Sequence, residues 1–266
     1  MEDGKSPLAS VAGSAATSRN RHDWIELCIG YGLILAVIWT SRPLQRFLFY
    51  FAIAVLLAIF WISLDGWAAM GLRATNFLRS LWMVGIALLL AAIAMFVAFR
   101  LGTLHVPNSP MLFLKTYVGY AVWSFVQQIL LLDFFLPRFQ RLLKNRKSAV
   151  MATAGIFSVA HVPSPILVPL TLLWGMAACL LFLRYRNLYP LAMAHAIFGI
   201  CIAMTVPGTV SHNMRVGLGY LQYRPPAEHR AGRSAAQRSQ MDHIVSTHAW
   251  VMADAPTLRW SRHARP

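Results

Sequence analysis

The stretch Leu78–Phe99, which reads LRSLWMVGIALLLAAIAMFVAF, decides the fold class of this chain. Arg79, next to its amino-terminal end, is the one charged residue in it. A helix needs about 20 predominantly apolar residues to cross the hydrocarbon core of a bilayer. The stretch therefore predicts a membrane-spanning helix, because a helix that is apolar on every side must be surrounded by lipid or by protein.

Six further apolar segments lie on either side of this stretch. They are Trp24–Thr40, Phe47–Leu64, Met111–Leu136, Ala149–Val162, Ile166–Leu183 and Leu188–Val206. The repetition predicts an all-α protein, a polytopic membrane helix bundle of about seven to eight transmembrane helices. We expect four regions along the chain: a polar amino-terminal segment (1–23), the first membrane helices (24–110), a core of further membrane helices (111–210) and a basic, disordered tail (211–266).

The composition supports the same fold class. Hydrophobic residues make up 58% of the 266 residues. Charged residues make up 12%, about half the share of roughly 25% that is typical of soluble domains. The 24 Lys and Arg outnumber the 9 Asp and Glu, and in a membrane protein such an excess is typical of cytoplasmic loops. We therefore expect contacts with membrane lipid and no nucleic-acid partner.

One basic loop orients the bundle. The loop Pro137–Ser148 contains five Lys or Arg side chains, namely Arg138, Arg141, Lys144, Arg146 and Lys147. With seven spans, this loop and the amino terminus lie on the same side of the membrane. The positive-inside trend predicts that this side faces the cytoplasm. We expect the protein to lie in the cell (inner) membrane. The Arg-rich tail would then lie on the opposite side, where long tails follow the trend poorly.

Polar residues inside the apolar segments indicate a candidate site. The pair Gln127-Gln128 lies in the fourth segment, His161 in the fifth and His195 in the seventh. At a rise of about 1.5 Å per residue, they lie about 10 to 18 Å from the cytoplasmic ends of their helices, so they reach similar depths. Each also has a purely structural interpretation, because Gln and His form hydrogen bonds between membrane helices. Three acidic residues lie closer to helix ends and are expected near the headgroups: Glu26, Asp65 and Asp133.

The sequence Pro163-Ser164-Pro165 begins two residues after His161. Proline removes a backbone donor and restricts the residue before it, so the fifth helix should end about two turns short of a full span. Irregular backbone at membrane depth is tolerated only against protein or a water-filled cavity. We therefore expect His161 at a broken helix end that faces a cavity. The alternative is a short helix followed by a tight turn near the surface.

The order and spacing of these residues resemble the CPBP family of intramembrane metalloproteases, also called the CAAX protease and bacteriocin-processing, or Abi, family. The three motifs of this family are Glu-Glu-x-x-x-Arg, Phe-x-x-x-His and His-x-x-x-Asn or Asp, on successive membrane helices. Phe157 and His161 match the second motif, and His195 matches the first residue of the third. The pair Gln127-Gln128 stands in the place of the two glutamates.

This resemblance, which covers about residues 112–206, implies a site and a reaction. In the family, a motif glutamate and the second-motif histidine are thought to activate water with a metal. By the resemblance, the catalytic candidates are Gln127, Gln128, His161 and His195. The two histidines are also the candidate ligands of a divalent metal such as zinc. The implied substrate is a membrane-associated or prenylated peptide, cut near the bilayer surface.

The motifs depart from the family at four positions. Gln127 and Gln128 replace both glutamates, Leu132 replaces the arginine and Gly199 replaces the last residue of the third motif. A neutral amide cannot take a proton from water, and general-base catalysis contributes about 10²–10⁴-fold. An oxyanion donor contributes about 10²–10³-fold. Asp133 is a poor substitute base, because it lies roughly 240° around an ideal helix from Gln127.

Three functions stay open on this basis. The first is a CPBP-type peptidase in which His161 holds water or metal, His195 polarises the scissile carbonyl and the glutamines orient water or substrate. The second is a catalytically silent protein of the same fold that binds a membrane peptide or another membrane protein, and the lost acids favour it. The third is a small transporter, which predicts pseudo-symmetric halves that the sequence does not display.

Overall fold

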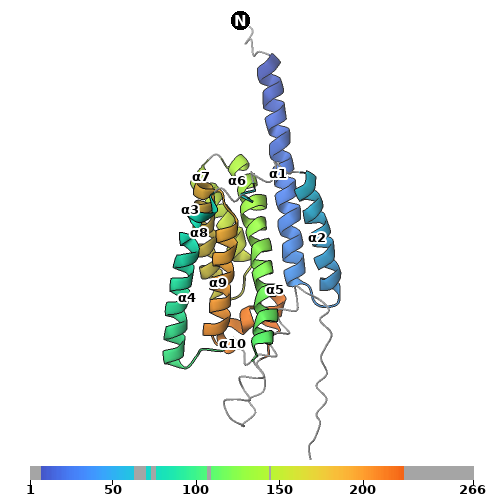
Figure 1. Cartoon of the computed structure of the whole chain (residues 1–266). Helices are drawn as coiled ribbons and strands as arrows, with labels where there is room; N and C mark the ends of the chain where they lie inside the picture. The colour runs from blue at the N-terminus through green and yellow to red at the C-terminus, as the bar shows by residue number, and fades with distance from the viewer. Residues whose placement is uncertain (1–6, 63–69, 73–75, 107–108, 144, 225–266) are drawn as a thin grey trace, which may run out of the picture.

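The computed structural model describes residues 7–62, 70–72, 76–106, 109–143 and 145–224 (Figure 1). Every regular element within these ranges is helical, which confirms the all-α prediction. The elements are α1 (Pro7–Trp39), α2 (Leu44–Ile62), α3 (Phe77–Ser80), α4 (Trp82–Leu101), α5 (Pro110–Ile129), the π-helix η1 (Leu130–Phe135), α6 (Leu136–Leu142), α7 (Arg146–Val159), α8 (Leu167–Tyr185), α9 (Tyr189–Thr205), α10 (Gly208–Ser211), the 3₁₀-helix η2 (His212–Met214) and α11 (Gly217–Leu221).

The membrane prediction holds, although the number of spans is lower than seven. Five stretches are long and apolar enough to cross a bilayer: Ser18–Trp39, Leu44–Ile62, Phe77–Leu101, Phe113–Leu142 and Leu167–Tyr185. A sixth candidate is the pair Tyr189–Thr205 and Gly208–Met214, which is bent by 115°. All seven predicted apolar segments form helices, but α7, with 14 residues, is too short to span. The protein is therefore an integral membrane protein, and the part of the chain that the structure describes holds five to six candidate spans.

The helices lie roughly parallel in one bundle (Figure 1). Within it, α9 packs against both α4 and α5, and α7 packs against α8. The helix α2 packs chiefly on α1, and α1 in turn contacts α6. The α1–α2 hairpin therefore stands beside the core of the bundle and is attached to it through α1. Large apolar side chains of α2 and α4 that do not line the cavity are exposed, and lipid would cover them: Phe47, Phe51, Ile62, Leu89 and Phe96.

The fourth span is continuous from α5 through η1 to α6. The π-helix η1 directly precedes Pro137, which is near the start of α6. Proline has no backbone N–H to donate to the preceding turn, and its ring crowds that turn, so a wider π turn is a usual response. This turn changes the directions of the side chains that follow it. The orientation of Asp133, which lies within η1, cannot be taken from ideal α-helical angles.

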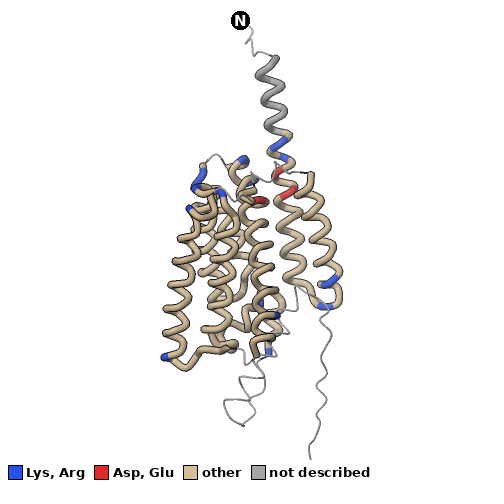
Figure 2. The backbone as a smooth tube through the Cα atoms, viewed as in Figure 1, with Lys and Arg blue, Asp and Glu red and all other residues tan. Residues whose placement is uncertain are grey.

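Two ion pairs connect α1 to α6. Arg138 donates from Nε to a Glu26 carboxylate oxygen at 2.7 Å. Arg141 donates from two nitrogens to both carboxylate oxygens of Asp23, at 2.6 and 2.7 Å. The acidic residues of the described ranges lie toward the upper end of the bundle (Figure 2). Asp65, which we expect near the headgroups, falls outside the described residues.

The first part of the predicted tail is folded. Residues 211–224 contain η2 and α11, and α11 packs against α1. Gly217 has a φ of 53°, and a Cβ at this position would overlap Ile38, so only glycine permits the close approach. Its backbone N–H donates to the carbonyl of Val162 at 2.8 Å, which connects this segment to the loop after α7. Residues 225–266, which we predict to be disordered, lie outside the described residues.

Candidate active site

The second-motif histidine lies at the tip of a hairpin formed by α7 and α8. A Cβ built on Gly175 in α8 would lie 3.2 Å from the Cα and Cβ of Ala154 in α7, so the absence of a side chain lets the two helices approach closely. The helix α7 ends at Val159, and Ser164 then accepts a hydrogen bond from the N–H of Leu167 at the start of α8. His161 therefore lies in the turn between the two helices.

The backbone fixes the ring of His161. Its Nδ1 lies 2.7 Å from the carbonyl oxygen of Phe157. A carbonyl oxygen only accepts hydrogen bonds, so Nδ1 carries the ring proton. The other ring nitrogen, Nε2, then has a lone pair and can accept a proton or a hydrogen bond. His161 lines a large cavity within the bundle.

Gln128 contacts the ring of His195 and gives it the opposite tautomer to that of His161. The amide Nε2 of Gln128 lies 2.8 Å from Nδ1 of His195, and both residues are buried. An amide nitrogen only donates, so Nδ1 of His195 accepts and the ring proton lies on Nε2. The amide Oε1 of Gln128 is buried without a hydrogen-bond partner. His195 therefore has a donor available on Nε2, and the two histidines have complementary hydrogen-bonding capacities.

Phe157 brings the two histidines together. Its ring centroid lies 4.9 Å from that of His161 and 5.9 Å from that of His195, edge to face in both cases. The ring centroid of Trp174 lies 6.0 Å from that of His195, and Trp174 also lines the cavity. Residues from α5, α9 and the α7–α8 hairpin thus meet at one place. The structure brings Gln128, His161 and His195 together at this place.

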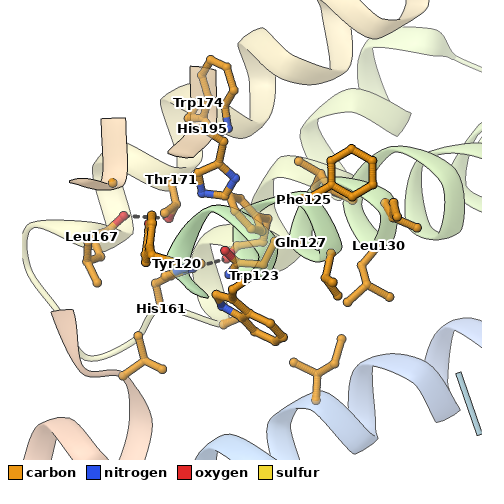
Figure 3. Close-up of a pocket in the computed structure, with 18 of the residues that line it drawn as sticks. Tyr120, Trp123, Phe125, Gln127, Leu130, His161, Leu167, Thr171, Trp174 and His195 are labelled. Atoms are coloured by element: carbon orange, nitrogen blue, oxygen red, sulfur yellow. Dashed lines mark hydrogen bonds between the residues drawn. The ribbon is translucent and has the colours of Figure 1, made fainter. Parts of the chain in front are cut away.

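The site opens onto a cavity of about 1390 Å³. Figure 3 shows Gln127, His161 and His195 on its wall, together with aromatic side chains such as Trp123. Gln127 faces the cavity, whereas the adjacent Gln128 is buried behind it. Among the described residues, no Asp or Glu lines this cavity, and Asp133 is not part of its wall. The proton acceptors that the described residues present to the cavity are therefore imidazoles and neutral oxygens.

The structure also accounts for two of the motif departures. Leu132, at the position of the arginine, is fully buried in the main hydrophobic cluster and faces no substrate. A Cβ on Gly199 would overlap the hydroxyl group of Tyr120, so Tyr120 fills the space that an asparagine side chain would need. Tyr120 lines the cavity as well. Sequence reasoning did not select Tyr120, although a glycine one turn after His195 signals that another side chain occupies that space.

The donor set does not fit a catalytic zinc ion. Such a site usually has three protein ligands, and no group of three His, Cys, Asp or Glu side chains within the described ranges could hold a metal. The Nε2 of His195 carries a proton in the arrangement set by Gln128, so it cannot ligate. Of the two histidines on the cavity wall, His161 is the one that presents an imidazole lone pair in this arrangement. One such ligand is too few for a catalytic zinc ion.

A comparison with known families supports a CAAX-type intramembrane protease-like fold. Residues 78–201 match the family described as type II CAAX prenyl endopeptidase Rce1-like. This match confirms the resemblance to the CPBP family, and it begins before α4 rather than at α5. No curated protein matches the chain. No solved structure matches it either.

Proposed function

We propose that the protein is a CAAX-type intramembrane endopeptidase that cleaves membrane-associated peptides in the cavity beside α5, α8 and α9. The observation that carries the proposal is the complementary pair of imidazoles, with a lone pair on His161 and a proton on Nε2 of His195. Hydrolysis of an amide needs one group that accepts a proton from water and another that stabilises the carbonyl oxygen. The two histidines supply one function each.

The reaction then proceeds with the residues of this chain. A water molecule bound to Nε2 of His161 attacks the carbonyl carbon of the scissile bond and gives its proton to that nitrogen. The carbonyl oxygen, which becomes negative, accepts a hydrogen bond from Nε2–H of His195. When the carbon–nitrogen bond breaks, the departing amine takes the proton back from His161. One carbon–oxygen bond forms, one carbon–nitrogen bond breaks, and a single water molecule is consumed.

Gln128 and Gln127 support this reaction without exchanging protons. Gln128 acts as a positioning residue, because its amide keeps the ring proton of His195 on the nitrogen that faces the carbonyl. Gln127, on the cavity wall, suits hydrogen bonding to the backbone of an extended peptide. The apolar and aromatic walls suit a prenyl group attached to that peptide. A prenylated peptide is therefore the substrate class that the cavity fits best.

The experiment is a cleavage assay in proteoliposomes. A farnesylated peptide with three residues after the modified cysteine is the substrate, and release of the tripeptide is followed by mass spectrometry in the presence of EDTA. We expect wild type to cleave and His161→Ala to lower kcat by about 10²–10⁴-fold. We expect His195→Ala to lower kcat by about 10²–10³-fold. His22→Ala, an exposed histidine on α1, is the matched control and should leave kcat unchanged.

A second candidate function is binding of such a peptide without hydrolysis. The absence of Asp and Glu from the described cavity wall favours it, because the family motif places carboxylates where this chain has Gln127 and Gln128. The double substitution Gln127→Glu and Gln128→Glu separates the two candidates. If the double variant cleaves and wild type does not, the protein binds without cutting. If wild type already cleaves with EDTA present, the binding-only function is excluded.

A further inference from the structure

The cavity extends well beyond the two histidines, into the space between the α1–α2 hairpin and the core. Tyr31 and Ile34 of α1 line this half, as do Leu56 and Phe60 of α2. These residues precede the region that matches the CAAX endopeptidase family, residues 78–201. This half of the cavity is therefore a feature of this chain outside the matched core. Its walls are almost entirely apolar, which suits hydrocarbon chains.

One end of this half is basic. Arg42 and Arg46 line the cavity where α1 turns into α2, and Arg215 lines it from the segment after η2. Arg42 and Arg215 are close enough to interact electrostatically. Figure 2 shows Lys and Arg at this lower end of the bundle, whereas the acidic side chains within the described ranges lie toward the upper end. Like charges held at the mouth of an apolar cavity attract an anion.

A buried amide lines the same cavity two residues before Arg215. Asn213 lines the cavity, is 6% exposed, and its Nδ2 is buried without a hydrogen-bond partner. Its φ of 52° lies in the left-handed region, between His212 and Met214 with φ values of 49° and 57°. Residues other than glycine adopt this conformation at a cost, and such strain is concentrated at binding sites. A ligand oxygen is the partner that this donor lacks.

The neighbouring aromatic rings hold this strained segment in place. The ring of His212 stacks on Tyr220 at 3.9 Å between centroids and on Tyr223 at 4.8 Å. Its Nδ1 contacts the carbonyl oxygen of Tyr220 at 3.1 Å. Arg215 in turn lies over the ring of Tyr223, at 5.4 Å from its centroid. The position of Arg215 and Asn213 is therefore fixed before any ligand binds.

We propose that Arg42, Arg46, Arg215 and Asn213 bind the phosphate of an anionic phospholipid, whose acyl chains occupy the cavity between the α1–α2 hairpin and the core. Guanidinium groups bind phosphate through paired, charge-assisted hydrogen bonds, and the amide of Asn213 adds a further donor. An apolar interior with a cationic mouth at the end of a membrane helix matches an amphiphile of this kind. The proposal does not depend on peptide hydrolysis, because it concerns binding alone.

The test is native mass spectrometry of the full-length protein in detergent. Three probes are added separately: dioleoylphosphatidylglycerol, dioleoylglycerol, which has the same chains without phosphate, and inorganic phosphate, which has no chains. We expect wild type to bind phosphatidylglycerol with a stoichiometry of one, and at least about tenfold more tightly than dioleoylglycerol or free phosphate, since one charged hydrogen bond contributes about a factor of ten.

Two triple variants that each remove three positive charges test whether the arginines that line the cavity bind the lipid. Arg42→Gln, Arg46→Gln and Arg215→Gln together should weaken phosphatidylglycerol binding by about tenfold or more. The control combines Arg100→Gln, Lys115→Gln and Arg224→Gln, which remove the same charge from the chain but do not line the cavity. Asn213→Ala should also weaken binding, by a smaller factor. Thermal unfolding of each variant verifies that it is folded.

Four results would overturn the proposal. Equal binding of phosphatidylglycerol and dioleoylglycerol would remove the role of the phosphate. Displacement of the lipid by inorganic phosphate at similar concentration would reduce the site to one for free anions. Equal losses in the two triple variants would assign the effect to net charge. Displacement by a farnesylated peptide with a free terminal carboxylate, but not by its amide, would assign the site to peptide ends. None of these readouts depends on cleavage, so failure of the proposed hydrolysis would be recognised separately.

Discussion

At the scale of single residues, the site depends on which nitrogen of each imidazole carries a proton. The carbonyl of Phe157 sets this for His161, and the amide of Gln128 sets it for His195. A glutamate at position 128 would accept a hydrogen bond and place the proton of His195 on Nδ1 instead. Gln128 is therefore not equivalent to a glutamate at the same position. The glutamine places the ring proton of His195 on Nε2, whereas a glutamate would place it on Nδ1.

Tyr120 is the residue whose role we expect to be most informative. Its hydroxyl group fills the space beside Gly199, where the family has an asparagine or aspartate that stabilises the oxyanion. If the hydroxyl group takes over that function, Tyr120→Phe should lower kcat by about 10-fold to 10²-fold with little change in KM, because only a hydrogen bond made in the transition state is lost. The measurement is a full kinetic curve for cleavage of the farnesylated peptide.

Tyr117→Phe is the control for this substitution, since it removes another buried tyrosine hydroxyl group from the same helix but does not line the cavity. A loss of activity confined to Tyr120→Phe supports the role. Equal kinetics of Tyr120→Phe and wild type would show that the hydroxyl group only fills space.

The sequence predicted which polar residues lie close together better than it predicted their hydrogen bonds. Gln128, His161 and His195 stood out because polar groups in apolar segments are rare, and the structure places them together. Tyr120 did not stand out, since tyrosine is common in membrane helices and only the space beside Gly199 gives it a role. The tautomers depend on whether the group facing each Nδ1 donates or accepts a hydrogen bond, which the sequence pattern does not specify.

At the scale of elements, the α7–α8 hairpin positions His161, and it depends on one glycine. Gly175→Leu should lower the free energy of unfolding by about 1–3 kcal/mol, because the new side chain would overlap the backbone of Ala154 in a packed interface. Thermal unfolding in detergent, followed by tryptophan fluorescence, measures the change. Gly155→Leu, in α7, is the matched control, since a Cβ there meets nothing within 4 Å. Equal stability of the two variants would contradict the close packing of this hairpin.

The sequence predicted the broken hairpin but not the π-helix. The proline pair after His161 indicated that the fifth segment ends early, and α7 does end at Val159. By contrast, the fourth segment reads as a regular helix in the sequence, whereas η1 adds a wide turn before Pro137. A single proline is compatible with a kink, a helix end or a π turn, and tertiary packing selects among them. The directions of the side chains within and after η1 therefore could not be predicted from the sequence.

At the scale of the whole molecule, two ion pairs attach the α1–α2 hairpin to the core. Arg138→Gln should lower the unfolding midpoint by about 4–8 °C, since removing one partner of a buried pair costs about 2 kcal/mol even when the other partner, Glu26, is partly hydrated. The comparison is with Arg146→Gln, an exposed arginine at the start of α7. If both variants unfold at the same temperature, the ion pairs do not stabilise the attachment of α1.

The orientation of the bundle is also testable. We propose that the end carrying the loop Pro137–Ser148 faces the cytoplasm, in the inner membrane, because that loop is strongly basic. In a Cys28→Ser background, a membrane-impermeant maleimide should label Ser41→Cys in intact cells and Lys147→Cys only after lysis. The other two cysteines are buried and give little background. Labelling of Lys147→Cys in intact cells would reverse the orientation.

Overall topology was largely predictable, because hydrocarbon solvent imposes long apolar segments that are visible in sequence. The predicted count of seven to eight spans is approximate, because α7 has only 14 residues and α9 reaches the length of a span only together with the bent segment after it. The cavity between the α1–α2 hairpin and the core was not predicted, because apolar periodicity does not distinguish a wall that faces a cavity from one that faces lipid.

The central claim is that His161 and His195 hold opposite tautomers in one cavity. Solid-state NMR of the ¹⁵N-histidine-labelled protein in lipid bilayers tests it most directly, with His161→Gln and His195→Gln difference spectra for assignment. We predict a ring proton on Nδ1 of His161 and on Nε2 of His195, and a move of the latter to Nδ1 in Gln128→Glu. The same tautomer for both rings in the native protein, or a His195 signal unaffected by Gln128→Glu, would contradict the account.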